Sequence, residues 1–324
     1  MTGSGDIIDA QFFYGLYEGV FKPHLVRTAL LLDVFTPLAE APLDAAGLGR
    51  AAGADAEGIA RLADYLVAIG VLERSEGRYS LTPTARAFLV RTSPAFAGDL
   101  VLEFTGPGLW QRVLTSVRSG EATSLLERFE QDAWVESHRA SRIASSLEMW
   151  AAAGILPVTR APLRILDLAS GCGIKTFCLA QEQPSVEVVC VDQAEVLVVA
   201  RDLAERMGIA DRVTLVPGDL LSLDLGEGTY EACLAGQITH YLTPAQNRDL
   251  FGRVHAALAE GGTFVIDVPM GEAEPGEVAA FLSLVLWANS GGTAYRYEEY
   301  EELLGASGFS RVRRAGDRWI VAEK

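Results

Sequence analysis

The sequence predicts an α/β fold in which an open, mostly parallel sheet follows a smaller and mainly helical domain. From residue 163 to 192 the chain reads as a strand, a glycine turn, a helix and a second strand, and an acidic residue ends each strand. Two further runs rich in β-forming residues, 213–216 and 232–235, continue this series. Before residue 164, apolar residues recur mainly at helical spacing. A chain of 324 residues is long enough for two such domains.

The first strand–turn–helix unit has the properties of a ligand-binding turn. Its strand, residues 165–168, is short and apolar, which is typical of a buried parallel strand. Gly171 and Gly173 let the backbone turn sharply and approach a ligand closely, because glycine has no Cβ. The helix that begins near Ile174 exposes unpaired amides in its first turn. The pattern therefore indicates a pocket for a nucleotide-like ligand.

Polar residues stand at or beyond the ends of four successive predicted strands, namely Asp167, Asp192, Asp219 and His240. Ligands of open α/β sheets bind outside the carboxyl ends of the strands, so these side chains should converge on one crevice. Asp192 stands where the diol of a ribose would need a bidentate acceptor. Each acid alone could equally be a strand-end cap or a solvated turn residue. Their shared register favours a site.

The N-terminal part reads as a winged helix-turn-helix. Apolar residues at helical spacing run to Gly70, which ends the last of these helices. Residues 71–81 then predict two short strands, and Thr82 with Pro83 opens another helix. Such a domain raises the possibility of a DNA-binding regulator. However, residues 50–90 hold as many acidic as arginine side chains, and the chain has a net charge of −16, which disfavours binding to phosphates.

These motifs resemble the class I S-adenosylmethionine-dependent methyltransferases, specifically the small-molecule O-methyltransferases with an N-terminal winged-helix dimerisation domain. The first motif of that family, an acidic residue and a Gly-x-Gly-x-Gly turn, corresponds here to residues 167–173, with Ala169 in place of the first glycine. The resemblance implies a Rossmann-like seven-stranded sheet whose last two strands form a hairpin near Gly316 and Asp317. It also implies a homodimer through apolar N-terminal helices such as residues 12–38, with the alternative that these residues only form the core of their own domain. We accordingly predict a winged-helix dimerisation domain over residues 1–120, a helical connector over 121–160 and a cofactor-binding domain over 161–324.

The resemblance implies S-adenosyl-L-methionine as cofactor and S-adenosyl-L-homocysteine as product. It implies that Asp192 holds the ribose hydroxyls and that Asp219 and Leu220 flank the adenine. The full set of expected cofactor-binding residues is Asp167, Ala169, Gly171, Gly173, Asp192, Gln193, Gly218, Asp219, Leu220 and Gln237. The alternative, a nicotinamide or flavin dinucleotide, requires a third glycine near position 176, where Thr176 stands instead.

His240 is the expected general base, because a neutral imidazole near a phenol is suited to remove its proton at cellular pH. It precedes a predicted helix from Pro244 to Leu258 and corresponds to the family's His-Asp-Trp motif, which reads His-Tyr-Leu here. Gly236 stands where many members have lysine or arginine. Of the two acids that orient the histidine in the family, one corresponds to Asp267 and the other falls at or near Ala294. A role for His240 in contacting substrate or capping its loop is the alternative.

The acceptor is expected to bind to helices near residues 125–150 and 278–288. Aromatic and other side chains there and in the preceding helices are the candidate contacts, although apolar residues at helical spacing are more often core. The predicted set is Phe104, Trp110, His138, Met149 and Trp287. No cysteine or histidine pair suggests a metal site, and the four cysteines read as buried, reduced thiols.

The predicted function is methylation of a hydroxyl group on a small aromatic or polyketide-like secondary metabolite. C- or N-methylation is the first alternative, and the second is other chemistry in a cofactor-binding relative, such as decarboxylation, hydroxylation or a pericyclic step. A DNA regulator or another non-enzymatic binding module ranks last. Apolar content is 49%, yet no run reaches the length needed to span a bilayer, and Asp6 and Asp9 disfavour a secretory signal. We therefore expect a cytoplasmic enzyme without membrane or nucleic-acid partners.

Overall fold

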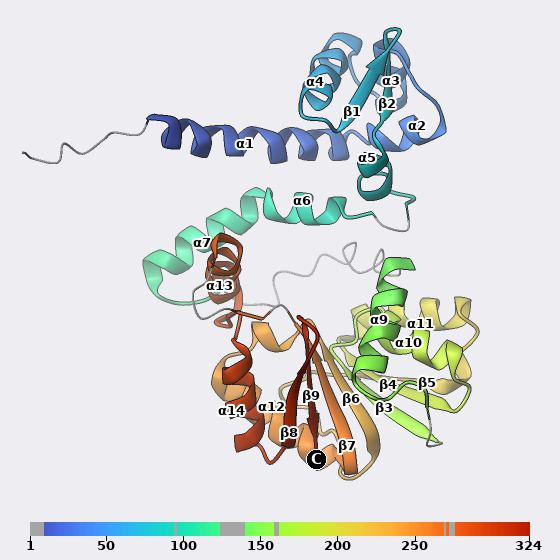
Figure 1. Ribbon diagram of the computed structural model, residues 1–324, viewed down its shortest axis with the longest axis vertical. Coiled ribbons are helices and arrows are strands. Elements are labelled where there is room, and N and C mark those ends of the chain that lie inside the picture. Colours follow the sequence, from blue (N-terminus) through green and yellow to red (C-terminus); the bar gives the residue numbers. More distant parts are fainter. Residues whose placement is uncertain (1–9, 94–95, 124–139, 159–161, 269, 272–275) are drawn as a thin grey trace, which may run out of the picture. The chain divides into compact units, whose positions relative to one another are not determined.

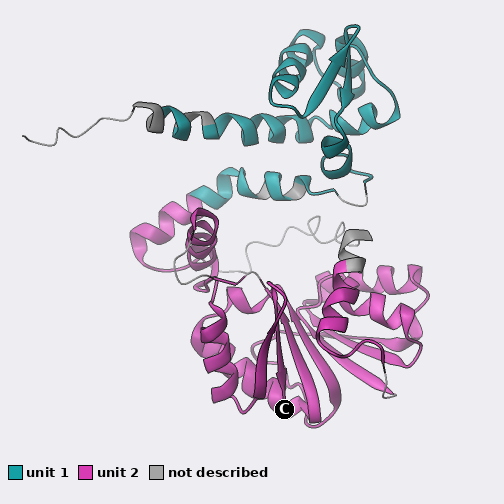
Figure 2. Cartoon of the chain, in the orientation of Figure 1, with its two compact units in different colours: residues 1–110 teal, residues 111–324 magenta. Residues whose placement is uncertain are grey.

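The computed structural model describes residues 10–93, 96–123, 140–158, 162–268, 270–271 and 276–324. Contacts within the chain divide it into two compact units, residues 1–110 and 111–324 (Figure 2). The division falls inside helix α7 (Pro107–Ser119), whereas the domain boundary predicted from the sequence lies just after this helix.

The N-terminal unit is mainly helical with one short hairpin (Figure 1). Its helices are α1 (Ala10–Leu31), α2 (Phe35–Glu40), α3 (Ala45–Ala52), α4 (Ala56–Ala68), α5 (Pro83–Phe88) and α6 (Gly98–Phe104), and its strands are β1 (Leu72–Ser75) and β2 (Arg78–Leu81). The side chains of Asp44, Asp55 and Thr82 cap α3, α4 and α5 by accepting backbone N–H groups, which explains why these helices begin where they do. The predicted hairpin and the helix opened by Thr82 and Pro83 are confirmed.

The C-terminal unit contains a seven-stranded sheet, as predicted, with the strand order β5-β4-β3-β6-β7-β9-β8. The strands are β3 (Leu163–Leu168), β4 (Val186–Asp192), β5 (Val213–Pro217), β6 (Tyr230–Gly236), β7 (Leu258–Asp267), β8 (Ser310–Ala315) and β9 (Trp319–Glu323). The first five are parallel, and β9 runs antiparallel to both β7 and β8. The predicted C-terminal hairpin is thereby confirmed.

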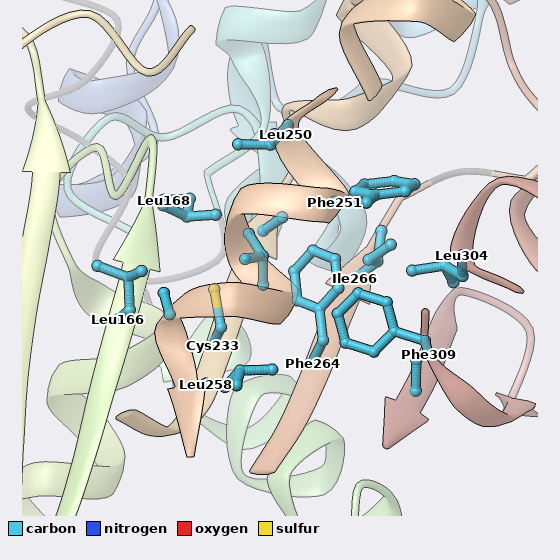
Figure 3. Close-up of a cluster of buried hydrophobic side chains, with 14 of the residues drawn as sticks. Leu166, Leu168, Cys233, Leu250, Phe251, Leu258, Phe264, Ile266, Leu304 and Phe309 are labelled. Carbon is cyan, nitrogen blue, oxygen red and sulfur yellow. The ribbon is translucent and has the colours of Figure 1, made fainter. Parts of the chain in front are cut away.

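Helices cover both faces of this sheet (Figure 1), namely α9 (Ala140–Ala152), α10 (Ile174–Glu182), α11 (Ala194–Arg206), α12 (Pro244–Ala257) and α14 (Tyr297–Ala306). Helix α13 (Glu277–Ser290) lies beside α7, and η2 (Ala210–Arg212) and η3 (Thr239–Tyr241) are short 3₁₀ turns. Alternate residues of the strands enter two separate cores, because successive side chains of a strand point to opposite faces. Leu166 and Leu168 pack with α12 and α14 (Figure 3), whereas Ile165 packs with α9, α10 and α11.

The sheet topology determines where a ligand can bind. The chain leaves β3 toward β4 and β5 on one side, and later returns to place β6 and β7 on the other. At such a switch point the loops above the carboxyl ends of neighbouring strands diverge and leave a crevice. The predicted site residues after β3, β4, β5, β6 and β7 therefore all stand at this one edge of the sheet.

Candidate active site

The turn between β3 and α10 is held by Asp192, which lies at the end of the neighbouring strand. One carboxylate oxygen of Asp192 accepts the amide of Gly171 (2.8 Å) and the other accepts the amide of Gln193 (2.8 Å). Burial raises the pKa of Asp192, and these two amides act against that shift. The structure thus brings together the glycine turn and the acid that the sequence analysis assigned to the ribose. Each oxygen retains further acceptor capacity for a ligand hydroxyl.

The backbone of this turn is left-handed at three positions. Ala169 has a φ of 50°, so the residue in place of the family's first glycine adopts a conformation that glycine adopts more easily. Gly173 has a φ of 78°, and a Cβ at this position would meet the ring of Phe177. Gly171 is also left-handed, with a φ of 58°. These constraints explain the glycine-rich pattern without reference to a ligand, and the amides of Ser170, Gly171 and Gly173 are donated within the protein.

Asp167 lies beneath the turn and is fully buried at 2% exposure. Thr176 donates its hydroxyl to the Asp167 carboxylate at 2.6 Å. This bond explains the threonine at the position where a dinucleotide-binding turn would have glycine. Burial raises the pKa of Asp167 to about 7, although the Thr176 hydrogen bond and the charge of Lys175 act in the opposite direction.

The loop after β5 carries the residues assigned to the adenine. The amide of Gly218 donates to the carbonyl of Asp192 (3.0 Å), which joins this loop to the end of β4. Asp219 is exposed and accepts the amide of Leu221 (3.0 Å). Leu220 is half-buried and packs against the core. Asp192, Gly218 and Asp219 therefore form one continuous polar rim above β4 and β5.

His240 lies on the η3 turn and is 4% exposed. The turn is fixed from several sides by buried groups that the sequence analysis did not identify. The Asn247 side chain donates to the carbonyl of Thr239 (2.9 Å), and the Tyr300 and Thr239 hydroxyls share a hydrogen bond (2.8 Å). Tyr295 donates to the carbonyl of Leu242 (2.6 Å). The imidazole therefore projects from an immobilised turn.

A cavity of about 350 Å³ lies at the same edge of the sheet. It is lined by Ser145, Ser146, Met149, Lys175, Gln237, Asp267 and Arg318. The sequence analysis named three of these residues, Met149, Gln237 and Asp267. His240 is not among the residues that line it. Gln237 has a φ of 63° and donates both its backbone and its side-chain N–H to the carbonyl of Asp267, at 2.8 and 3.0 Å.

Asp267 forms ion pairs with two cationic side chains. Its carboxylate accepts the Lys175 ammonium at 2.6 Å and the Arg318 guanidinium at 3.3 Å. Burial acts to raise the pKa of Asp267, but these two charges outweigh it and the pKa lies below its usual value. Asp267, which the sequence analysis expected to orient His240, thus already forms an ion pair with Lys175. At the position of the second orienting acid, Ala294 is buried and apolar.

Sequence reasoning missed Lys175, although the chain carried a signal for it. Lys175 is the second residue of α10, and a cation in the first turn of a helix is disfavoured by the helix dipole. A lysine at this position therefore needs a partner or a function. Its partner Asp267 is distant in sequence, and only the pairing of β3, β6 and β7 brings the two side chains together.

The predicted acceptor contacts fall in different parts of the chain. Phe104 and Trp110 belong to the N-terminal unit, where the Trp110 indole donates to the carbonyl of Phe104 (3.0 Å). Met149 and Trp287 belong to the C-terminal unit, and of these two only Met149 lines the cavity. His138 lies outside the described residues. The four cysteines are all buried free thiols, and burial raises the pKa of Cys178 to about 11.

Among the described residues, no three histidine, cysteine, aspartate or glutamate side chains lie together in a way that could hold a metal ion. No helix in the described part of the chain is both long and apolar enough to cross a membrane.

Comparison with known proteins matches both parts of the chain. Residues 14–91 match the family model of the O-methyltransferase dimerisation domain, and residues 165–262 match that of a methyltransferase domain. The chain is 27% identical over 311 residues to the 3-hydroxy-5-methyl-1-naphthoate 3-O-methyltransferase of Streptomyces sahachiroi, covering 92% of this chain and 89% of that protein. It is 28% identical over 339 residues to the phenazine-1-carboxylate N-methyltransferase of Pseudomonas aeruginosa, covering 99% of each.

A solved structure has the same fold. PigF of Serratia sp., an S-adenosyl-L-methionine-dependent methyl transferase, was solved with S-adenosyl-L-homocysteine (SAH). It superposes with a TM-score of 0.82 at 24% identity, over 97% of this chain and 99% of that one. The agreement extends over both units of the chain.

Proposed function

Because the chain belongs to the S-adenosylmethionine-dependent methyltransferases with an O-methyltransferase dimerisation domain, we propose that it methylates a hydroxyl group of a small aromatic or polyketide-like secondary metabolite, with His240 as general base. The cofactor is S-adenosyl-L-methionine. When bound, this cofactor supplies a methyl group made electrophilic by the adjacent sulfonium. The protein then has to place the acceptor oxygen in line and to receive its proton.

The residues at the edge of the sheet suit the cofactor. Asp192 offers acceptor oxygens to the ribose hydroxyls, and the same carboxylate holds the glycine turn through the amide of Gly171. We assign the adenine to the loop of Gly218, Asp219 and Leu220. We assign the methionine end to the turn above Asp167 and to Gln237. These assignments follow the rim of described residues from β5 toward β6.

The single observation that carries the role of His240 is the fixation of its turn. A general base must lie within hydrogen-bond distance of the proton that it removes, and a loosely held base loses much of its effect. Asn247, Tyr295 and Tyr300 hold the η3 turn by side chains that are themselves buried. The use of several buried polar groups to hold one short turn supports a role in which the position of His240 must be fixed.

Cofactor binding is tested by calorimetric titration with SAH. We expect the wild-type chain to bind SAH and Asp192→Ala to bind it at least about tenfold more weakly, through loss of charge-assisted hydrogen bonds. The matched control is Asp202→Ala, which removes an exposed acid from α11. Equal affinities of Asp192→Ala and the control would show that the ribose assignment is misplaced. Absence of SAH binding by the wild type would refute the proposed activity.

N-methylation is the second candidate, favoured by the full-length similarity to an N-methyltransferase and by Ala294 at the position of the second acid. A neutral amine attacks through its lone pair and requires no base before transfer, unlike a hydroxyl. The two activities therefore differ in their dependence on His240. Turnover of an amine acceptor that survives His240→Gln would favour this candidate over O-methylation.

We also propose that the chain forms a homodimer through its N-terminal unit, which contains the dimerisation domain. Helix α1 exposes large apolar side chains, namely Tyr14, Leu16, Val20, Phe21 and Leu31. A largely apolar groove of about 550 Å³ runs between α1 and α4, lined by residues such as Leu25, Ile59 and Leu62. Apolar surface of this kind is typical of a subunit interface.

A further inference from the structure

The cavity lined by Met149, Lys175 and Asp267 adjoins the switch point between β3 and β6. The rim assigned to the ribose and adenine stands above β4 and β5, on one side of the switch point between β3 and β6. The cavity is lined by Ser145, Ser146 and Met149 of α9 and Lys175 of α10, and by Gln237 after β6, Asp267 at the end of β7 and Arg318 before β9. If the ribose and adenine are held above β4 and β5, the cavity would offer space for the acceptor beside the methionine end, which we assign to the turn above Asp167 and to Gln237.

The cavity carries an excess of positive charge. Its lining contains two cations, Lys175 and Arg318, and one anion, Asp267. The Lys175 side chain is 21% exposed and lies 2.6 Å from Asp267, so its ammonium is held at the wall. An ammonium has three N–H donors, of which Asp267 accepts one. The hydroxyls of Ser145 and Ser146 and the amide of Gln237 add neutral hydrogen-bonding groups.

The place of the ammonium depends on Gly236. A Cβ at residue 236 would lie 2.9 Å from the Lys175 Nζ and 3.2 Å from its Cδ. The glycine at the end of β6 therefore leaves the space through which the lysine side chain reaches Asp267. A lysine in the first helical turn and a glycine at the end of a central strand are each unfavourable alone. The path of the lysine side chain above β6 explains both.

We propose that Lys175, together with Arg318, binds a carboxylate of the acceptor, so that the enzyme methylates an aromatic acid. This inference rests on the proposed methyltransferase function and narrows its substrate class. A carboxylate in the cavity would accept the remaining N–H donors of Lys175 and offset the positive excess, while Asp267 keeps the lysine in place. Charge-assisted hydrogen bonds of this type are among the strongest in proteins.

The test compares an acid with its neutral isostere. With SAH saturating, the affinities of 1-naphthoate and 1-naphthamide are measured by calorimetry. We expect the wild type to prefer the acid by about tenfold or more, which is the usual effect of a hydrogen bond to a charged group. Lys175→Met should abolish this preference. The matched control is Lys324→Met, because Lys324 donates to the carbonyl of Leu258 at the opposite end of β7 and should not affect either ligand.

Loss of the Lys175–Asp267 pair could impair folding, so Lys175→Gln provides a second variant that keeps a hydrogen-bond donor for Asp267 and removes the charge. Thermal unfolding of both variants establishes that they are folded. Loss of the acid preference in Lys175→Gln supports the proposal. Retention of the preference in either folded variant refutes it.

A carboxylate at Lys175 could also come from the methionine end of the cofactor, and a second pair of ligands separates the two sources. SAH has this carboxylate, and 5′-methylthioadenosine lacks it. If Lys175→Gln weakens binding of SAH but not of 5′-methylthioadenosine, and leaves the naphthoate preference intact, the lysine serves the cofactor and the proposal is overturned. Equal wild-type affinity for acid and amide, with normal SAH binding, refutes only this inference, whereas absence of SAH binding refutes the proposed function.

Discussion

Replacement of Asp167 by asparagine should stabilise the chain, and more so at higher pH. Asp167 is buried at 2% exposure, and its pKa is about 7 instead of 3.8. Asparagine is nearly isosteric, remains neutral at every pH and keeps an oxygen that can accept the Thr176 hydroxyl. The substitution therefore removes the titration of this residue with little change in packing.

The direction of the stability change with pH depends on whether the folded or the unfolded state releases the Asp167 proton first. Below about pH 4 the Asp167 carboxyl is protonated in both states and contributes no pH dependence. As the pH rises toward 7, the unfolded chain releases the proton while the folded chain retains it, so the wild type loses stability. Above about pH 7 both states are ionised and the loss is complete. A shift of about three pH units corresponds to about 4 kcal/mol, at 1.36 kcal/mol per unit.

The assay is urea unfolding of the ligand-free chain and of Asp167→Asn at pH 5 and at pH 8. The stability difference in favour of the variant should be about 2–3 kcal/mol greater at pH 8, because roughly a third of the loss is already present at pH 5. Packing effects of the substitution do not titrate and shift both values equally. Asp202→Asn on α11 is the exposed control. A difference that stays constant between pH 5 and pH 8 would refute the reasoning.

Three further predictions concern the η3 turn and the subunit interface. His240→Gln should lower turnover of a hydroxyl acceptor about 100-fold, measured by SAH release, and should leave the SAH affinity measured by calorimetry unchanged. His255→Gln on α12 is the control. Equal turnover of the two variants would contradict a general-base role. Gly292→Ala should destabilise by about 1–3 kcal/mol in urea unfolding, because a Cβ there would lie 2.1 Å from the carbonyl oxygen of His240. Gly252→Ala, whose Cβ meets nothing within 4 Å, should not destabilise, and a similar loss in both variants would speak against the close contact. Leu16→Asp on α1 should lower the mass measured by light scattering from twice to once 34.8 kDa, and an unchanged dimer would place the interface elsewhere.

Much of the fold could be predicted because its signals are local. Thr82 with Pro83 marks one helix start and Pro244 begins another predicted helix, and in the structure Thr82 and Thr243 cap these two helices. The parallel strands follow from short apolar runs that end at polar residues, and the shared edge of Asp167, Asp192 and Asp219 follows from the topology alone. Each of these inferences requires only neighbouring residues and general rules of chain connection.

The packing of the His240 turn could not be predicted in this way. Asn247, Tyr295 and Tyr300 hold η3 through hydrogen bonds to backbone or hydroxyl groups on other elements. In the sequence, Tyr295 and Tyr300 resemble core residues with aromatic area to bury. Their polar ends become informative only when the chain is folded. Burial raises the pKa of Tyr295 to about 12, which keeps its hydroxyl a donor to Leu242 across the physiological range.

Lys175 shows the same limit at the proposed binding site. The family resemblance suggests that a cation is missing at Gly236, where many members have lysine or arginine. That inference considers each position by itself. In the folded chain the missing side chain is what lets Lys175 cross above β6 and pair with Asp267. A cation thus stands next to position 236, although it comes from α10. Substitution at Gly236 should therefore act through Lys175: Gly236→Val should force the ammonium away from Asp267 and weaken binding of 1-naphthoate, without changing any charge. If Gly236→Val binds 1-naphthoate as tightly as the wild type while Lys175→Gln does not, the glycine has no part in placing the lysine.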